Sequence, residues 1–522
     1  MNVDLNISSK LNNDEKELFS ILLKVVEKYA PRVTLRIAGG WVRDHILGTP
    51  SDDIDVMIDY MAGQDFAKLV TQYLNIKDPN VIQANPEASK HITTAKCYIP
   101  LSSGKKQEVD FAQARQEIYK EDSRIPDIQP ATPQQDAYKR DLTINSLFYN
   151  LRTGQIEDFT GKGIKDIITN TIQTPEDPLK TFSDDPLRIW RVVRFCAKYN
   201  GQIDPETYKA LTNPKLRDEI KNKVSKERIG QEFIKILKNP NADKALQILK
   251  DTGLWEDIIS EAIKGTPYEG QLAPLNMEQN NPWHTLTVWG HTLQVVINIL
   301  SQYKNAEPER RIVMTLAALM HDLGKTYKKI WSDSKSHPGK TSYIGHEFES
   351  AKLVELIFKY LKIEPYIKEI ALLSRLHMRP HSLLQQKAGD KGLRKFIRET
   401  GEISLNWLDV FNLAVADAQA KSTVQDPEIT QRYQQLKSNL QNALQSFSTP
   451  QQDKPYTKPI LNGNEITQIL NIKPGPIIKE VIDYLKDLRD ENPNITKEEA
   501  TEKIKEKFSK TAKSFIITKI YT

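Results

Sequence analysis

The stretch Ile37-Ala-Gly-Gly-Trp-Val-Arg-Asp44, followed by Ser51-Asp-Asp-Ile-Asp-Val-Met-Ile58, decides how this sequence folds and what it does. In the second half, apolar residues alternate with polar ones, which predicts a short strand. Side chains two positions apart in a strand share a face, so we expect Asp53 and Asp55 to point the same way. Neighbouring carboxylates repel each other unless a cation lies between them. Oxygen ligands at this spacing suit Mg²⁺.

The glycines Gly39 and Gly40 precede an expected helix start, where backbone N–H groups can approach a phosphate closely. An Asp-x-Asp pattern alone is more often a surface turn or a solvated strand edge. Together with the Gly-Gly-x-Val-Arg-Asp stretch, it resembles the signature of the nucleotidyltransferase superfamily, in particular class II tRNA nucleotidyltransferases and bacterial poly(A) polymerases. The resemblance implies that Asp53 and Asp55 are catalytic and bind Mg²⁺, and that Gly39, Gly40 and Arg43 hold a triphosphate.

The composition predicts a multidomain protein of the cytoplasm. At 522 residues the chain is too long for one ordinary core. The net charge of +5, from 73 basic and 68 acidic residues, permits nucleic-acid binding without arguing for it. Two cysteines cannot form a disulfide framework, so we expect a reducing compartment. We see no secretion signal and no apolar run of about 18 residues, so we expect no membrane segment.

Periodicity and composition indicate several further elements. Residues 1–30 are expected to form a helix capped near Asn12, and residues 62–74 another. Residues 182–199 form the clearest later helix pattern. Residues 266–282, rich in Pro, Gly and Asn, are the best linker candidate.

A third acidic residue lies in a strand-rich segment. Residues 81–113 end in Glu108-Val-Asp-Phe-Ala112, which reads as a strand. Asp110 within it is either a third catalytic carboxylate that faces Asp53 and Asp55 or an ordinary edge-strand aspartate.

Lys139-Arg140-Asp141, followed by Asn145, places positive charge and amide groups where a nucleotide could be held. The tripeptide resembles the Arg-Arg-Asp motif of the family, with lysine in place of the first arginine, and lysine cannot make a bidentate fork. The resemblance implies that Arg140, Asp141 and Asn145 bind the nucleotide. Three other segments, residues 85–91, 132–137 and 157–163, look like the eukaryotic-type CCA-adding enzymes more than the bacterial poly(A) polymerases.

Base selection is expected in Phe182-Ser-Asp-Asp-Pro-Leu-Arg-Ile-Trp-Arg-Val-Val-Arg-Phe195. Asp185 and Arg188 are three residues apart, so in a helix they would share one face and brace each other. A carboxylate accepts and a guanidinium donates, so the pair could read the Watson–Crick edge of cytosine or adenine. The alternative is a helix-start salt bridge, but the segment resembles the family's Glu/Asp-Asp-x-x-Arg motif. Arg191 and Arg194 continue the basic face. We expect them to bind the nucleotide or an RNA phosphate, or to have a structural role.

Seven of the nine histidines fall within about a hundred residues. They are His284, His291, His321, His337, His346, His377 and His381. Imidazoles and carboxylates together bind divalent metals, although a single core histidine is usually structural. With His321-Asp322 and the Val415-Ala-Asp-Ala418 segment, the block resembles the HD phosphohydrolase superfamily. The resemblance implies a divalent metal of unspecified identity and the ligands His291, His321, Asp322, His346, His377 and Asp417.

We therefore expect an α+β protein: a small mixed β-sheet nucleotidyltransferase head (residues 1–160), a helical neck (161–275), an all-α HD domain (276–430) and a helical tail (431–522). The resemblance implies template-independent addition and repair of the CCA end of tRNA from CTP and ATP, with an additional phosphatase or 2′,3′-cyclic phosphodiesterase activity. The alternatives are a poly(A) polymerase, an A-adding or CC-adding specialist, a non-catalytic RNA-binding protein, and a protein whose main activity is that of the HD block.

Overall fold

The computed structural model describes residues 5–49, 51–76, 80–82, 94–118, 127–282, 284–421, 427–447 and 459–518. The chain divides into two compact units, Met1–Ile258 and Ile259–Thr522, which are described separately. The segment 85–91, one of those that look like eukaryotic-type enzymes, lies outside the described residues. The division into four domains stays a prediction.

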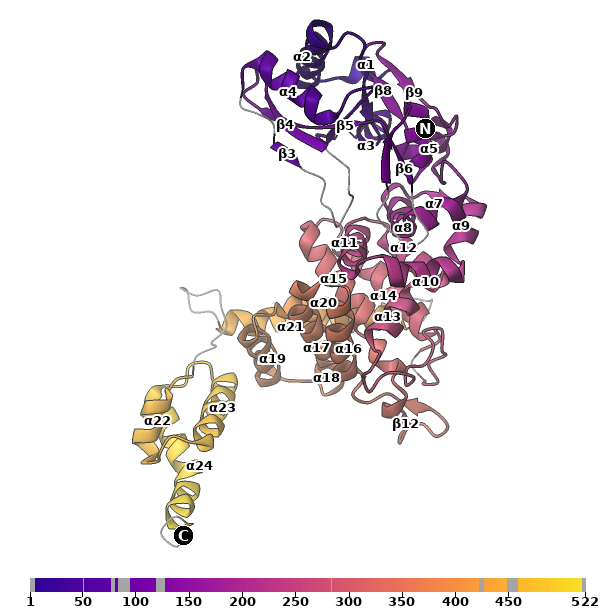
Figure 1. The fold of residues 1–522 in the computed structure, drawn as a ribbon. Helices are drawn as coiled ribbons and strands as arrows, with labels where there is room; N and C mark the ends of the chain where they lie inside the picture. Colours follow the sequence, from indigo (N-terminus) through magenta and orange to yellow (C-terminus); the bar gives the residue numbers. More distant parts are fainter. Residues whose placement is uncertain are drawn as a thin grey trace. The chain divides into compact units, whose positions relative to one another are not determined.

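The first unit contains a mixed sheet with the strand order β3-β4-β5-β2-β1-β8-β9 (Figure 1). Its strands are β1 (Leu35–Ala38), β2 (Ile54–Ile58), β3 (Asn80–Ile82), β4 (Thr94–Pro100), β5 (Lys106–Gln113), β8 (Phe148–Asn150) and β9 (Gln155–Glu157). Strands β2 and β5 are parallel, whereas β1–β2 and β4–β5 are antiparallel. A separate pair is formed by β6 (Arg115–Ile118) and β7 (Asp127–Pro130). This sheet confirms the predicted α+β class.

The helices of the head are α1 (Ile7–Lys10), α2 (Asn13–Tyr29), α3 (Gly40–Ile46), α4 (Gly63–Leu74) and α5 (Pro133–Lys139), with a 3₁₀ turn at Thr143–Asn145. The structure confirms the helices expected near residues 40 and 62–74, divides the helix expected over residues 1–30 into α1 and α2, and adds α5, which was not predicted. The side chain of Asn12 accepts from the backbone N–H of Glu15, and the Glu15 carboxylate accepts from the N–H of Asn12. This capping box confirms the predicted helix start. Helix α4 packs on β4 and β5 (Figure 1).

The rest of the first unit is helical, as predicted. Its helices are α6 (Gly163–Thr169), α7 (Pro178–Asp184), α8 (Arg188–Tyr199), α9 (Pro205–Leu211), α10 (Pro214–Lys223), α11 (Lys226–Leu237), α12 (Ala242–Asp251) and α13 (Leu254–Ala262), which contains the boundary between the units. The short strands β10 (Thr171–Ile172) and β11 (Gln202–Ile203) pair in parallel. The apolar side of α8 packs against α11 and α12.

The prediction of one continuous helix over residues 182–199 is wrong. The chain leaves α7 at Asp185, which has an extended backbone with φ −141°. Pro186 disfavours helical geometry in the residue before it and has no N–H to donate. Proline therefore ends α7, and α8 begins anew at Arg188.

The second unit is a helical assembly. Its helices are α14 (Val288–Gln302), α15 (Pro308–Met320), α16 (His346–Tyr360), α17 (Ile367–Leu376), α18 (Met378–Gln385), α19 (Asp390–Glu402), α20 (Trp407–Gln419) and α21 (Pro427–Phe447), with a small hairpin of β12 (Ser332–Asp333) and β13 (Thr341–Ser342). Helix α14 packs against α15 and α20, and α16 packs against α17. Helices α22 (Gly463–Leu470), α23 (Pro476–Glu491) and α24 (Lys497–Thr518) share a separate apolar core.

Residues 266–282 are not the linker that their composition predicts. The backbone N–H of Ala273 donates to Thr326 O at 2.8 Å, and Leu275 O accepts from Trp289 N–H at 2.8 Å. The segment therefore packs into the second unit. Among the described residues, no helix is both long and apolar enough to cross a membrane. Both cysteines, Cys97 and Cys196, are buried free thiols.

Candidate active sites

Three carboxylates meet on neighbouring parallel strands of the head. Asp53 immediately precedes β2 and Asp55 lies within it, and both are exposed while Ile54 and Val56 are buried. The register of β2 and β5 places Asp55 directly beside Asp110. The shared face of Asp53 and Asp55 is thus confirmed, and the structure brings Asp110 to them.

This arrangement suits a divalent cation. The loss of solvation beside the neighbouring strands and the negative charge of Asp53 raise the pKa of Asp55, and partial burial raises the pKa of Asp110 despite nearby Lys96. The Asp110 Oδ1 atom is shielded from solvent without a hydrogen-bond partner, although Lys96 Nζ lies 3.8 Å away. Crowded, electron-rich carboxylate oxygens of this kind are the ligands that hard cations prefer.

The glycine turn lies beside this cluster. Gly39 has φ +67°, and a Cβ atom there would lie 2.7 Å from Arg140 Nη1, so glycine is needed both for the turn and for the close approach of Arg140. The Arg140 guanidinium donates to Asn145 O at 3.2 Å and also lowers the pKa of Asp55. Arg140 therefore places positive charge between the glycine turn and the carboxylates.

Arg43, which the resemblance assigns to the triphosphate, contacts side chains of α3, the Asn145 turn and α8. Its side chain is buried and donates to both oxygens of Asp44, at 2.8 and 3.0 Å, and to Asn145 Oδ1. It also lies over the Phe195 and Tyr199 rings, 5.1 Å from each centroid. These contacts brace α3 against α8, and the assignment of Arg43 to the triphosphate stays a prediction.

A buried polar chain joins the Asn145 turn to α8. Asn145 Nδ2 donates to Asp141 Oδ1 at 3.0 Å, and Arg191 Nε donates to Asp141 Oδ2 at 2.7 Å. Burial raises the pKa of Asp141, but the positive charge of Arg191 outweighs burial and holds this pKa at about 2. Arg194 pairs in the same way with Glu232, at 2.6 Å. Both arginines of the predicted basic face are thus held by carboxylates.

We expect Asp141→Ala to destabilise the first unit by about 2 kcal/mol, the worth of hydrogen bonds to a charged group, because Arg191 stays 34 % exposed and can be solvated. That loss corresponds to a thermal midpoint about 4–8 °C lower. Folding lowers the pKa of Asp141 from its unfolded value of 3.8 to about 2. The ionised Asp141 carboxylate therefore stabilises the folded state above pH 3.8, and this stabilisation is lost as the pH falls towards 2. Calorimetry at pH 7 with exposed Asp218→Ala as the control checks this; equal midpoints would contradict it.

The expected base-selecting pair does not share a helical face, because Asp185 ends α7 and Arg188 begins α8. Asp185 Oδ1 accepts from the backbone N–H of Leu187 at 3.1 Å, and its Oδ2 lies 3.3 Å from Arg228 Nη2. Arg188 is buried, and its Nη1 donates to Thr181 O at 3.4 Å. Because the helix is interrupted at Pro186, Asp185 lies at the end of α7 and Arg188 lies at the start of α8.

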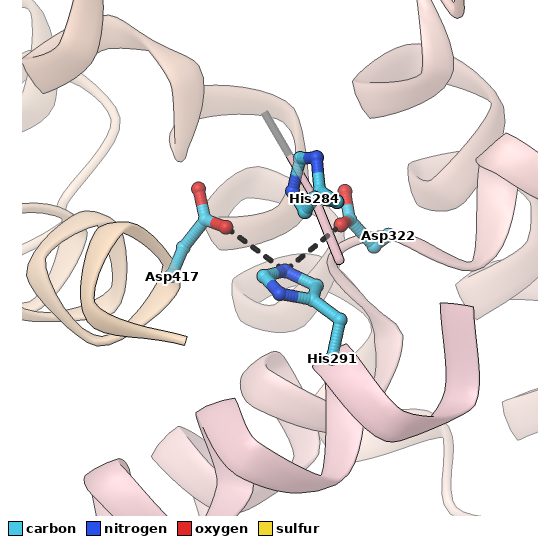
Figure 2. Close-up of side chains that lie close together, drawn as sticks. All are labelled: His284, His291, Asp322 and Asp417. Carbon is cyan, nitrogen blue, oxygen red and sulfur yellow. Dashed lines mark ion pairs between the residues drawn. The ribbon is translucent and has the colours of Figure 1, made fainter. Parts of the chain in front are cut away.

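A second cluster lies in the second unit. Nε2 of His291 is 2.9 Å from Asp417 Oδ1 and 3.2 Å from Asp322 Oδ2 (Figure 2). Nε2 of His321 is 3.4 Å from Asp322 Oδ2. Around the other oxygen of Asp322, Oδ1, lie Nε2 of His346 at 3.1 Å and Nε2 of His377 at 3.8 Å. All six predicted ligands are therefore together, with Asp322 at their centre.

The backbone fixes the orientation of four of these histidines. In each, Nδ1 lies within hydrogen-bond distance of a carbonyl oxygen: Ala420 O for His291 (3.1 Å), Ala318 O for His321 (2.8 Å), Tyr343 O for His346 (2.9 Å) and Ser374 O for His377 (2.6 Å). A ring whose Nδ1 donates to a carbonyl presents the Nε2 lone pair to a metal. The cluster thus has the outer contacts of a metal site.

The electrostatics favour a cation at this cluster. Despite burial, Lys325 and His321 hold the pKa of Asp322 well below its usual range, and His291 and His381 do the same for the pKa of Asp417. Burial lowers the pKa of His291, but the carboxylates of Asp322 and Asp417 outweigh burial and raise this pKa to about 9. The carboxylates thus attract positive charge, whether a proton on His291 or a metal ion.

Sequence reasoning missed several contributors. Among the described residues, two groups of side chains have potential ligand atoms within 4.8 Å of one another, and both contain Asp322. The second is Asp322, His346 and His377, whereas the first includes His284, which was counted among the histidines but not assigned. Lys325 Nζ lies 2.6 Å from Asp322 Oδ2, a contact that the His-Asp-x-x-Lys spacing could have suggested. His381 contacts Asp417 Oδ2 at 2.7 Å and so orients a ligand.

Comparisons with known proteins agree with this division of sites. Residues 35–173 match the family described as poly A polymerase head domain, residues 202–264 the probable RNA and SrmB-binding site of polymerase A, and residues 288–406 the HD domain. The tRNA nucleotidyltransferase cca1 of Schizosaccharomyces pombe is 32% identical over 508 residues, which cover 94% of this chain and 95% of that protein. The chain belongs to the tRNA nucleotidyltransferase family.

A second relative matches about half of the chain, and a solved structure with low sequence identity matches nearly all of it. The mitochondrial CCA tRNA nucleotidyltransferase of Saccharomyces cerevisiae is 41% identical over 266 residues, 49% of this chain and 47% of that one. The structure of the Thermotoga maritima CCA-adding enzyme with tRNA is 18% identical and covers 97% of this chain and 99% of that one, with a TM-score of 0.58. This last likeness shows a shared fold.

Proposed function

We propose that the chain adds C, C and A to the 3′ end of tRNA, using CTP and ATP. The observation that carries the proposal is the placement of Asp55 beside Asp110 on parallel strands, with Asp53 and the Gly39 turn adjoining, in a chain related along 94% of its length to a tRNA nucleotidyltransferase. A non-catalytic RNA-binding protein would not need this carboxylate cluster.

The residues of the head divide the work of nucleotidyl transfer. Mg²⁺ ions held by Asp53, Asp55 and Asp110 would activate the 3′-hydroxyl and stabilise the charge of the departing pyrophosphate. The start of α3 at Gly39 and Gly40 would bind the triphosphate, and Arg140, which approaches Gly39 closely, would neutralise phosphate charge. The α-phosphate would thereby be positioned for attack by the tRNA.

Label transfer tests the reaction type. With tRNA that lacks its CCA end and CTP labelled at the α-phosphate, we expect label in the tRNA and one pyrophosphate released per nucleotide added. Release of nucleoside diphosphate, or of pyrophosphate without labelling of the tRNA, would contradict nucleotidyl transfer.

Base choice is assigned to Asp185 and Arg188. The Asp185 carboxylate is held by Arg228 and by the N–H of Leu187, so it can accept from an exocyclic amine in a fixed geometry. Cytosine and adenine both present an amine beside an acceptor nitrogen, which the Arg188 guanidinium can approach. Uracil and guanine present a carbonyl at that position, which the carboxylate would repel.

We expect Asp185→Ala to reduce the preference for CTP over UTP by about 10- to 100-fold, which is the worth of one hydrogen bond to a charged group plus the lost repulsion. Competition between CTP and UTP for the same truncated tRNA measures this preference. The neighbour Asp184, 3.6 Å from Lys139, provides the control Asp184→Ala, which should retain it. An unchanged preference in Asp185→Ala would remove this residue from base selection.

For the second unit we propose metal-dependent hydrolysis of phosphomonoesters or 2′,3′-cyclic phosphates. The observation that favours it is the convergence of His291, His321, Asp322 and Asp417 with fixed Nδ1 contacts, together with the HD-domain match. A divalent metal held there would lower the pKa of a bound water and polarise a phosphoryl oxygen. Buried Lys325, beside Asp322, would add positive charge near the phosphate.

The identity of both metals and the location of the protein remain proposals. Mg²⁺ suits the all-carboxylate site of the head, whereas imidazole-rich sites suit transition metals. A cytoplasmic location follows from the cysteine usage alone, and one relative is named as mitochondrial.

A further inference from the structure

His284 belongs to the second unit's cluster by geometry. A ring nitrogen of His284 lies within 4.8 Å of ligand atoms of His291, Asp322 and Asp417 (Figure 2). The His284 and His291 rings meet edge to face, with centroids 4.8 Å apart. The Nε2 atom of His284 is shielded from solvent, and no described residue gives it a hydrogen-bond partner.

The loop around His284 holds the ring in one orientation. Asn281 Oδ1 lies 3.0 Å from both the backbone N and the Nδ1 atom of His284. The amide oxygen is an acceptor, so Nδ1 carries the proton and the Nε2 lone pair is left available. On the other side, the N–H of Thr285 donates to Lys421 O at 3.2 Å, next to Ala420, whose carbonyl orients His291.

The Nδ1 atom of His284 contacts a side-chain amide oxygen, whereas the Nδ1 atoms of four other histidines in the cluster contact backbone carbonyl oxygens. In both cases the contact leaves Nε2 available for a metal. A buried ring nitrogen without a partner costs free energy, so its placement among carboxylates calls for a ligand. We infer that His284 is a further metal ligand of the second unit, which completes the half of the cluster formed by His291, Asp322 and Asp417, and that Asn281 is its positioning residue.

The cluster has two halves, and both contain Asp322. His284, His291 and Asp417 lie on one side, and His346 and His377 lie on the other. A carboxylate with two oxygens can bridge two cations, so removal of His284 should weaken binding on one side only. The inference about His284 rests on the proposed function of the second unit as a metal-dependent hydrolase.

Uptake of Co²⁺ by the full-length chain tests the inference. An Asp55→Ala parent is used so that the head contributes little metal. In this parent, we expect His284→Ala to weaken binding of one Co²⁺ by at least about 100-fold and Asn281→Ala by about 10-fold, because loss of an outer contact alone costs 10- to 100-fold. His337, whose Nδ1 contacts Ser336, lies outside both ligand groups, so His337→Ala should bind Co²⁺ as the parent does.

The outcomes separate the inference from the function on which it rests. Equal Co²⁺ affinity in the parent and in His284→Ala would overturn the inference, whereas a parent that takes up no Co²⁺ in the second unit would overturn the proposed metal-dependent hydrolase. If metal-free His284→Ala melts well below the parent, X-ray absorption of Co²⁺-loaded Asn281→Ala decides. Fewer imidazole ligands per ion than in the parent would support the inference, and an unchanged number would contradict it.

Discussion

Asp55→Ala is expected to lower nucleotide addition to tRNA by at least about 1,000-fold, because a catalytic cation supplies several kcal/mol of charge stabilisation in the transition state. Asp55 lies beside Asp110 and shares a face with Asp53, so its removal takes away the central oxygen ligand. Single-turnover incorporation of labelled CTP into tRNA lacking CCA, at saturating Mg²⁺, measures the effect on the chemical step.

The neighbouring Asp52 supplies a matched control. Its side chain is 88% exposed and pairs with Lys105 at 2.9 Å, outside the carboxylate cluster. We expect Asp52→Ala to keep the rate within about twofold, since exposed ion pairs contribute little. If Asp55→Ala retained the rate of Asp52→Ala, the carboxylate cluster would not be the catalytic centre.

Asp322→Asn is expected to lower hydrolysis of a 2′,3′-cyclic nucleotide to the open-ring nucleoside monophosphate by at least about 1,000-fold while nucleotide addition stays unchanged. Asp322 is buried and, among the described residues, is the one carboxylate that belongs to both ligand groups. The asparagine keeps the volume and one acceptor oxygen, so the fold should survive beside Lys325. Metal-activated hydrolysis by the full chain measures the loss.

Exposed Asp333, in the same unit, provides the control, because Asp333→Asn changes the same charge on the surface. We expect this control to hydrolyse the substrate as the wild type does. Together with Asp55→Ala, which should lose addition and keep hydrolysis, Asp322→Asn shows whether the two activities are separate. Loss of both activities in either single variant would contradict two independent centres.

The sequence was most informative where local pattern and chemistry coincide. The shared face of Asp53 and Asp55 follows from strand alternation, whereas their expected catalytic role and the six HD ligands follow from motif resemblance; short-range spacing determines both. The neighbour relation of Asp55 and Asp110 depends on parallel pairing of strands some 50 residues apart, which no local pattern specifies. The sequence could therefore suggest Asp110 but not decide its role.

Tertiary context also explains the errors. A helix was expected over residues 182–199, yet the geometry that Pro186 imposes on Asp185 divides the segment into two helices. The contacts of Arg43 with the aromatic rings of α8 and with the Asn145 side chain join residues far apart in the sequence, so no local pattern reveals them. Residues 266–282 have the composition of a linker, yet they carry Asn281 and lead into His284.

The central claim, that this chain builds the CCA end of tRNA, is tested most directly by incubating tRNA that lacks CCA with CTP alone, ATP alone, or both, and sequencing the 3′ ends. We predict addition of two C residues with CTP alone and of C, C and A, followed by arrest, with both nucleotides. Long A tails with ATP, addition that stops after CC when both nucleotides are present, or A addition only to tRNA that already ends in CC would contradict the account.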